Sequence, residues 1–264
     1  MTQELTDAEQ SLLSRVGDML AKVFATPAGD DLSLTAGDHA KLVGGDRAKL
    51  TGGLRATMIG GHASTLTGGH ESTLTGGDDS TLTGGDDSTL TGGDDAVLVG
   101  GYLSTLTGRC RSILTGGVRS MLAGGADSRL TGGYGSTLTG GLGSTLVGGD
   151  GSTLTGGIFS RLTGGRCSKL TGGDGAELTA GDNSLLVGGR DATLTAGIGS
   201  ILTVAWWQDG LDDERLDPAH ARIVASKIGV VGEDGLLPDV PYRWVDDRWV
   251  AQTAQASNQR TDDA

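Results

Sequence analysis

The sequence predicts an all-β fold, a flat two-sided β-solenoid, and three observations support that prediction. An apolar residue recurs every eight residues from Leu34 to Leu202, through 22 units without an insertion or deletion. Polar and apolar residues alternate around it, which is typical of a strand that is buried on one side. Gly-Gly separates most units and indicates a tight turn after each strand.

The composition favours a repeat protein over an enzyme. Of 264 residues, 49 are Gly and only four are Pro, which argues against collagen. This glycine content suggests a repeat architecture in which every turn needs a special backbone conformation. Four Trp, three Tyr and two Phe are too few for an ordinary globular core. The net charge of −13 makes nucleic acid and anionic membrane surfaces poor partners, and no apolar run approaches the ~20 residues of a membrane span.

Residues 1–29 are predicted to form an amphipathic helical cap. Thr6-Asp7-Ala8-Glu9 is a capping-box pattern, and Ala28-Gly29 would end the helix. Apolar residues between them follow helical spacing: Leu12, Leu13, Val16, Met19, Leu20 and Val23. We expect this apolar stripe to fold over the first coil, with a membrane-bound or partner-bound helix as the alternative.

Residues 30–204 are predicted to form the solenoid. Two positions before the recurrent apolar residue lies Ser in 15 units and Ala in six. Because side chains alternate across a strand, the Leu and this small residue point inward and the two residues that flank Leu point outward. Eight residues are too few to go out and return, so two units form one sixteen-residue coil. Eleven coils at ~4.8 Å give a rod roughly 50 Å long.

Residues 205–250 are predicted to form a C-terminal cap. The eight-residue period stops after Leu202, and all four Trp of the chain follow it. Exposed end coils would otherwise be templates for strand pairing, so a solenoid needs caps at both ends. Residues 251–264 are polar, and we expect them to be disordered.

The outward threonines divide the solenoid into two unequal faces. Counted from Leu34, odd and even units lie on opposite sides of the rod. The even units carry five Thr-Leu-Thr strands in six successive coils: Thr73/Thr75, Thr89/Thr91, Thr105/Thr107, Thr137/Thr139 and Thr153/Thr155, with Met121/Ala123 between. The odd units are patchier and pair Thr65/Thr67 and Thr81/Thr83 before Val97/Val99.

A flat threonine array is chemically suited to holding water. Each Thr combines a hydroxyl with a methyl, and β-branching makes χ1 stiff, so the hydroxyls repeat in register. Neighbours lie ~7 Å apart along a strand and ~4.8 Å apart between coils. Such a lattice can hold ordered first-shell water at low entropic cost. The alternative is that Thr merely suits exposed strand positions, which predicts an even mixture of residues on both faces.

Two stretches illustrate the repeat: Tyr134-Gly135-Ser136-Thr137-Leu138-Thr139 and Ala180-Gly181-Asp182-Asn183-Ser184. Four motifs follow the repeats: Trp207-Gln208-Asp209-Gly210, Arg222-Ile223-Val224, Gly232-Glu233-Asp234-Gly235 and Asp239-Val240-Pro241-Tyr242. Together they resemble the sixteen-residue repeats and the C-terminal cap of bacterial ice nucleation proteins, over residues from about 30 to 245. The resemblance implies a water-organising solenoid that assembles into larger ice-nucleating structures at the cell surface or outer membrane.

The chain also departs from that family. Members usually carry many more coils and a larger N-terminal domain, whereas residues 1–29 alone precede the repeats here. The family's stacked edge tyrosines, linked with pairing, are reduced to Tyr102 and Tyr134. The alternative, which the small number of coils favours, is an antifreeze-like protein that binds existing ice. The start of the chain lacks the pattern of a secretory signal peptide, so without the resemblance a cytoplasmic location is expected.

Assembly into a homo-oligomer or fibre is predicted from segregated charge. Asp78 to Asp95 is an acidic block, and Lys41, Arg47, Lys49 and Arg55 lie toward one end. Toward the other end lie Arg161, Arg166 and Lys169, which echo the family's arginine-rich terminal coils. We expect the acidic block of one rod to contact a basic end of another.

Other functions find little support in the sequence. The glycine-rich unit superficially resembles the calcium-binding nonapeptide of toxin repeats, but its period is eight and Ser or Thr replaces the required Asp. Acidic turns such as Asp78-Asp79 could hold a cation, although solvated turn residues are the simpler interpretation. The four His lack ligand spacing, and Cys110 and Cys167 lie too far apart for a disulfide. We therefore expect no catalytic residue, metal or cofactor, and a structural or adhesive rod remains the third alternative.

Overall fold

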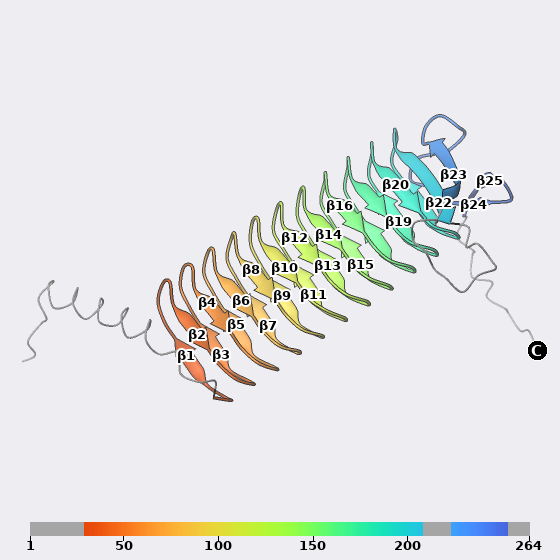
Figure 1. The fold of residues 1–264 in the computed structure, drawn as a ribbon. Helices are drawn as coiled ribbons and strands as arrows, with labels where there is room; N and C mark the ends of the chain where they lie inside the picture. Colours follow the sequence, from red (N-terminus) through yellow and green to blue (C-terminus); the bar gives the residue numbers. More distant parts are fainter. Residues whose placement is uncertain (1–28, 208–222, 253–264) are drawn as a thin grey trace, which may run out of the picture.

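The computed structural model of the chain describes residues 29–207 and 223–252. These residues form a straight rod of stacked coils that carries additional strands at its C-terminal end (Figure 1). They contain strands and turns but no helix. The predicted helical cap over residues 1–28, residues 208–222 of the predicted C-terminal cap and residues 253–264 of the predicted tail lie outside the described residues.

The first 22 strands alternate between two parallel sheets, which confirms the predicted solenoid of sixteen-residue coils. Each strand pairs with the strand two further along the chain at an offset of sixteen residues, so Leu82 lies opposite Leu98 and Leu98 opposite Leu114.

The 13-stranded sheet contains β1(Ser33–Thr35), β3(Lys49–Thr51), β5(Thr65–Thr67), β7(Thr81–Thr83), β9(Val97–Val99), β11(Ile113–Thr115), β13(Arg129–Thr131), β15(Thr145–Val147), β17(Arg161–Thr163), β19(Glu177–Ala180), β21(Thr193–Ala196), β24(Tyr242–Val245) and β25(Arg248–Ala251). The 12-stranded sheet contains β2(Lys41–Val43), β4(Thr57–Ile59), β6(Thr73–Thr75), β8(Thr89–Thr91), β10(Thr105–Thr107), β12(Met121–Ala123), β14(Thr137–Thr139), β16(Thr153–Thr155), β18(Lys169–Thr171), β20(Leu185–Gly188), β22(Ile201–Trp207) and β23(Ile223–Val230). We call the outward surface of the 13-stranded sheet the odd face and that of the 12-stranded sheet the even face.

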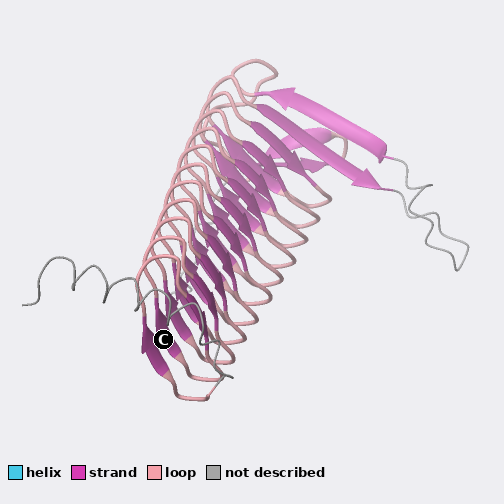
Figure 2. Cartoon of the chain, turned by 60° about the vertical axis from the view of Figure 1, so that its left-hand side comes forward, coloured by secondary structure: helices cyan, strands magenta, loops and turns pink. Residues whose placement is uncertain are grey.

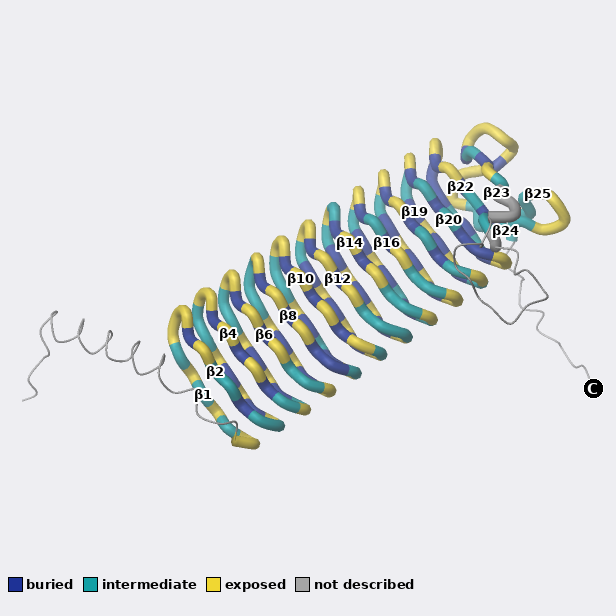
Figure 3. The backbone as a smooth tube through the Cα atoms, in the orientation of Figure 1, coloured by how far each residue is buried: buried dark blue, intermediate teal, exposed yellow. Residues whose placement is uncertain are grey.

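The core is a double row of leucines between the two sheets. The central residue of each strand from Leu50 to Leu202 is at most 2% exposed, and the small Ser or Ala two positions before it is buried as well. Figure 3 shows the resulting alternation of buried and exposed positions along each coil. Burial of one leucine contributes about 1.5–3 kcal/mol, so the stacked rows stabilise a fold that has few aromatic side chains. Each coil contacts only its neighbours, which makes stability nearly one-dimensional.

Every turn of the solenoid contains a special backbone conformation, as the glycine content predicts, but this conformation does not fall on the Gly-Gly pair. In all 22 turns, positive φ occurs three positions before the central apolar residue of the next strand, at residues such as Asp79 (φ 56°) and Gly135 (φ 63°). The Gly pair is needed for space instead. A Cβ on Gly76 would lie 2.5 Å from Ser80 Oγ, and one on Gly77 would lie 2.9 Å from the backbone of Gly61 in the preceding coil.

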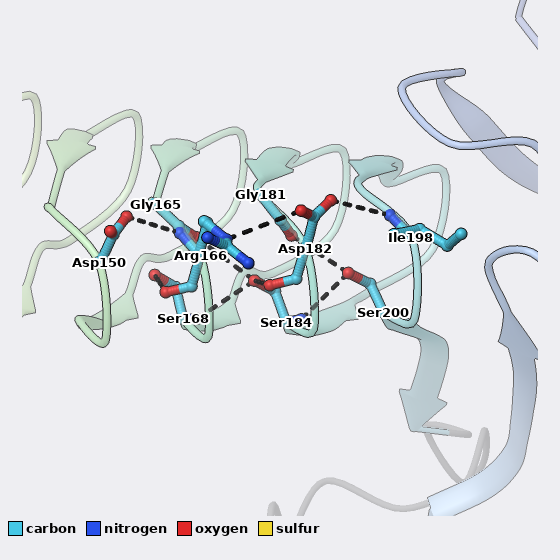
Figure 4. Close-up of polar contacts among 9 residues, drawn as sticks. All are labelled: Asp150, Gly165, Arg166, Ser168, Gly181, Asp182, Ser184, Ile198 and Ser200. Atoms are coloured by element: carbon cyan, nitrogen blue, oxygen red, sulfur yellow. Dashed lines mark hydrogen bonds and ion pairs between the residues drawn. The ribbon is translucent and has the colours of Figure 1, made fainter.

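The interior serines change their hydrogen-bond partner near the C-terminal end. From Ser88 to Ser144, most serine hydroxyls donate to the carbonyl three residues earlier. Ser184 and Ser200 instead donate to carbonyls of the preceding coil, at 3.3 and 3.1 Å (Figure 4). Ala180 and Ala196 stand four positions before these two serines, whereas Gly stands four positions before each serine from Ser64 to Ser168. Ser168 has the same orientation although Gly164 precedes it.

Antiparallel strands close both sheets at the C-terminal end. β23 pairs along the whole of β22, while β24 pairs with β21 and forms a hairpin with β25 (Figure 2). Trp244 and Trp249 pack edge to face there, with ring centroids 5.3 Å apart. The ordered chain continues past the predicted boundary at residue 250, because Ala251 pairs with Tyr242 and Gln252 donates to the Pro241 carbonyl.

Candidate functional site

The structure divides the fourteen predicted water-binding threonines between the two faces. All point outward, because the residues that flank each buried Leu are the exposed positions of their strands. The even face carries Thr73, Thr75, Thr89, Thr91, Thr105, Thr107, Thr137, Thr139, Thr153 and Thr155. The odd face carries Thr65, Thr67, Thr81 and Thr83.

On the even face the threonines form two straight columns in register. Thr73 lies opposite Thr89 and Thr89 opposite Thr105, while Thr75, Thr91 and Thr107 form the parallel column. Nine of the ten threonines are exposed and Thr153 is half-buried. The parallel register spaces hydroxyls ~4.8 Å apart along each column and ~7 Å apart across a strand. No charged residue points outward from this sheet between β4 and β16, so nothing ionic interrupts the lattice there.

The strand β12 interrupts both columns. Met121 stands where a Thr would continue the first column and is 58% exposed, and Ala123 stands in the second. Since Ala lacks the β-branch, the surface sinks here into a shallow hollow of about 210 Å³ between β10 and β14. The hollow separates a block of three Thr-Leu-Thr strands from a block of two.

The odd face carries one continuous column of β-branched residues. The position after Leu holds nine Thr and two Val over eleven strands: Thr35, Thr51, Thr67, Thr83, Val99, Thr115, Thr131, Val147, Thr163, Thr179 and Thr195. The position before Leu is irregular and includes Arg129, Arg161 and Glu177. The column is not apparent when strands are compared as whole Thr-Leu-Thr units. The sequence shows it when the residues at the position after Leu are counted by themselves. A single column offers hydroxyls in one direction only.

Many turns begin with an aspartate whose side chain accepts a hydrogen bond from the backbone of the next coil. Asp78 Oδ1 accepts the backbone N–H of Asp94 at 2.8 Å, and Asp94 Oδ1 in turn accepts that of Cys110 at 3.1 Å. The same bond is made by nine aspartates: Asp30, Asp38, Asp46, Asp78, Asp86, Asp94, Asp150, Asp174 and Asp182. Within residues 29–207 and 223–252, no group of three His, Cys, Asp or Glu side chains is placed to hold a metal ion. These carboxylates therefore have a structural role in the turns.

Ion pairs between neighbouring coils run along both edges. The hydrogen bonds from Arg47, Arg55 and Arg111 lower the pKa values of Asp31, Glu71 and Asp95 respectively. Each of these pairs is exposed to solvent, and exposed pairs contribute little individually because water and salt screen them.

The predicted assembly residues lie on different surfaces of the rod. Arg161 on the odd face donates to Glu177 at 2.8 Å, which raises the pKa of its guanidinium. Arg166, in a turn, lies 3.7 Å from Asp182, also within the chain (Figure 4). Lys169 points outward from the even face at β18, while Tyr102 and Tyr134 are exposed in turns of one edge, two coils apart. The three basic residues therefore lie within one coil toward the C-terminal end, as predicted, but they project from different surfaces of the rod.

The remaining reactive groups are dispersed. Cys110 and Cys167 are both free thiols, in turns of opposite edges. His62 and His70 also lie on opposite edges, each 3.6 Å from an aspartate. In the described ranges, no helix is long and apolar enough to cross a bilayer.

Within residues 29–207 and 223–252, the even face is thus where Thr occupies both outward columns over the most strands. Comparison of the chain with protein-family models, with curated proteins and with solved structures finds no match in any of the three.

Proposed function

We propose that the chain is an ice-binding protein that orders water on the even face and thereby promotes ice nucleation. One observation carries the proposal: five Thr-Leu-Thr strands in six consecutive coils form two parallel columns of exposed, in-register threonines without a charged neighbour. Solvent-exposed strands under no such constraint would carry charged and other residues as well. The first column of the odd face does so, with Lys49, Val97, Ile113, Arg129, Arg161 and Glu177 among its residues.

The physical basis is the fixed position of the hydroxyls. Each Thr side chain is stiff at χ1, and the parallel ladder fixes its Cα, so the array meets water without first losing much conformational freedom. Methyl groups between the hydroxyls limit the competing orientations of the first water layer. A binding surface whose side chains are already fixed loses little conformational entropy on binding, and rigid sites gain affinity for this reason.

Antifreeze-like growth inhibition is the second candidate, and the interruption at β12 favours it. Nucleation requires a large ordered patch, whereas adsorption to existing ice requires only a small one. The longest uninterrupted block on the even face spans three strands, β6 to β10. Nucleation by this chain therefore depends on self-assembly that enlarges the patch, through contacts such as those proposed for Arg161, Arg166, Lys169, Tyr102 and Tyr134.

A droplet-freezing assay and an ice-shaping assay on one purified sample test the proposal. We expect droplets to freeze at a higher temperature than buffer, by an amount that increases with the assembly state measured by sedimentation. Faceted ice crystals without raised freezing temperature would assign the chain to growth inhibition. A sample with neither effect would leave the structural rod as the better interpretation.

Repair of the interrupted lattice is expected to increase the activity. The double change Met121→Thr and Ala123→Thr fills the hollow at β12 and joins the two blocks into six consecutive Thr-Leu-Thr strands. We expect a higher freezing temperature, or stronger ice shaping, at equal protein concentration, because the ordered patch doubles in length.

A matched control adds the same two residues to the other face. Val97→Thr and Val99→Thr extend the odd face by one Thr-Leu-Thr strand after β7. This change should leave the activity near that of the unmodified protein. A larger gain from the odd-face change than from the even-face change would contradict the assignment of the active face.

A further inference from the structure

The two ends of the rod differ in whether further strands pair with the outermost strands of the solenoid (Figure 1). At the C-terminal end, β23 and β24 pair with the last strand of each sheet, and Leu194 and Leu202 of the last coil are fully buried. At the N-terminal end, β1 and β2 have no strand on their outer side in the part of the chain that the structure describes. Leu34 and Leu42 of the first coil are only partly buried.

Backbone groups at the open end also lack the partners that they have elsewhere. The N–H groups of Lys49 and Thr57 donate to carbonyls of the preceding coil at 2.7 and 2.8 Å. The equivalent N–H groups of Ser33 and Lys41, and the carbonyls of Thr35 and Val43, have no partner among residues 29–207 and 223–252. An open edge of this kind, with apolar side chains beside it, attracts the edge of another sheet.

We propose that residues 1–28 of the same chain cover this end and stop rods from joining end to end. The segment reaches the rod at Gly29, directly beside the first turn at Asp30-Asp31. Its six apolar residues between Leu12 and Val23 follow helical spacing. In that conformation they form one stripe that can bury Leu34 and Leu42.

The segment has enough residues to reach across the end face. From Thr6 to Val23 the segment has 18 residues, which as a helix would extend about 27 Å. One half-turn of eight residues extends at most about 26 Å. The predicted helix is therefore long enough to extend across both leucines.

A second copy of the chain is the other possible occupant of the open end. Two first coils that met face to face would exclude residues 1–28 from the surface and would join the sheets of two rods. The apolar stripe, which would then be left in water, favours the intramolecular cap. With both ends closed, contacts between rods are limited to their faces and edges.

The test disrupts the apolar stripe in the full-length chain with Leu13→Glu, Val16→Glu and Leu20→Glu. Hydrogen exchange is measured at the amides of Ala36 and Gly44, which hold the first coil to the second, and at Gly76 in the middle of the rod. We expect exchange at Ala36 and Gly44 to become faster on the order of tenfold while Gly76 keeps its protection. Sedimentation should also show larger species that increase with protein concentration.

The control places the same three charges on the opposite side of the predicted helix, with Ser11→Glu, Ser14→Glu and Ala21→Glu. This variant should match the unmodified protein in both measurements. The proposal is overturned if both variants change the first coil equally, or if neither does. It is also overturned if the unmodified protein sediments as a dimer whose first coil loses protection on dilution, which assigns the open end to a second copy. Neither measurement involves ice, so the result is independent of the proposed function.

Discussion

Replacement of Thr89, Thr91, Thr105 and Thr107 by Lys is expected to abolish the effect on ice while the fold is retained. These side chains form the centre of the three-strand block on the even face, and all four are exposed. Lysine replaces four fixed hydroxyls with long, mobile, hydrated ammonium groups that cannot hold a lattice of water. The strands themselves should persist, because an outward substitution in an exposed strand changes β-propensity by at most ~1 kcal/mol. Droplet freezing reports the activity and circular dichroism reports the fold.

The matched control makes the same change on the odd face. Thr65, Thr67, Thr81 and Thr83 also lie in two consecutive coils and are equally exposed. Their replacement by Lys adds the same charge to a face that has no block of three consecutive Thr-Leu-Thr strands, so a much smaller loss is expected. Equal loss from the two sets would mean that the even face is not the active surface.

Leu138→Asp is expected to cause the largest loss of stability. Leu138 is fully buried and stacks between Leu122 and Leu154 in the centre of the rod. A carboxylate there loses its hydration without gaining a partner, and the apolar contacts of the leucine are lost as well. The cost should be on the order of 3–5 kcal/mol or more. Because each coil is stabilised only by its neighbours, the parts of the rod on the two sides of residue 138 should then unfold in separate transitions.

Urea unfolding followed by circular dichroism measures this loss. Thr137→Asp is the control, because it places the same carboxylate on the adjacent, exposed residue. An outward substitution of this kind should change stability by at most ~1 kcal/mol. Similar costs for the two variants would contradict the inward direction of the central leucine.

Much of the candidate site could be predicted from the sequence, because a strand assigns side chains to faces by a simple alternation. Once Leu106 is inside, Thr105 and Thr107 must lie outside, and the sixteen-residue repeat stacks them on Thr89 and Thr91. The regular column of the odd face could also have been found in the sequence, by counting the position after Leu by itself. One feature depended on the structure: the substitutions in β12 form a hollow rather than only a change of residue type.

The sequence by itself determined the period, the register and the direction of every side chain in the solenoid, since these follow from local alternation and from a repeat without insertions. Only the tertiary structure decided how the turns and ends are built. It placed the positive φ at residues such as Asp79, two positions after the Gly pair, and it gave Asp78 a backbone N–H of the next coil as its partner. It also distinguished a closed C-terminal end from an open N-terminal one. These features depend on contacts between coils sixteen residues apart and on strands that leave the repeat, and a pattern within one eight-residue unit contains neither.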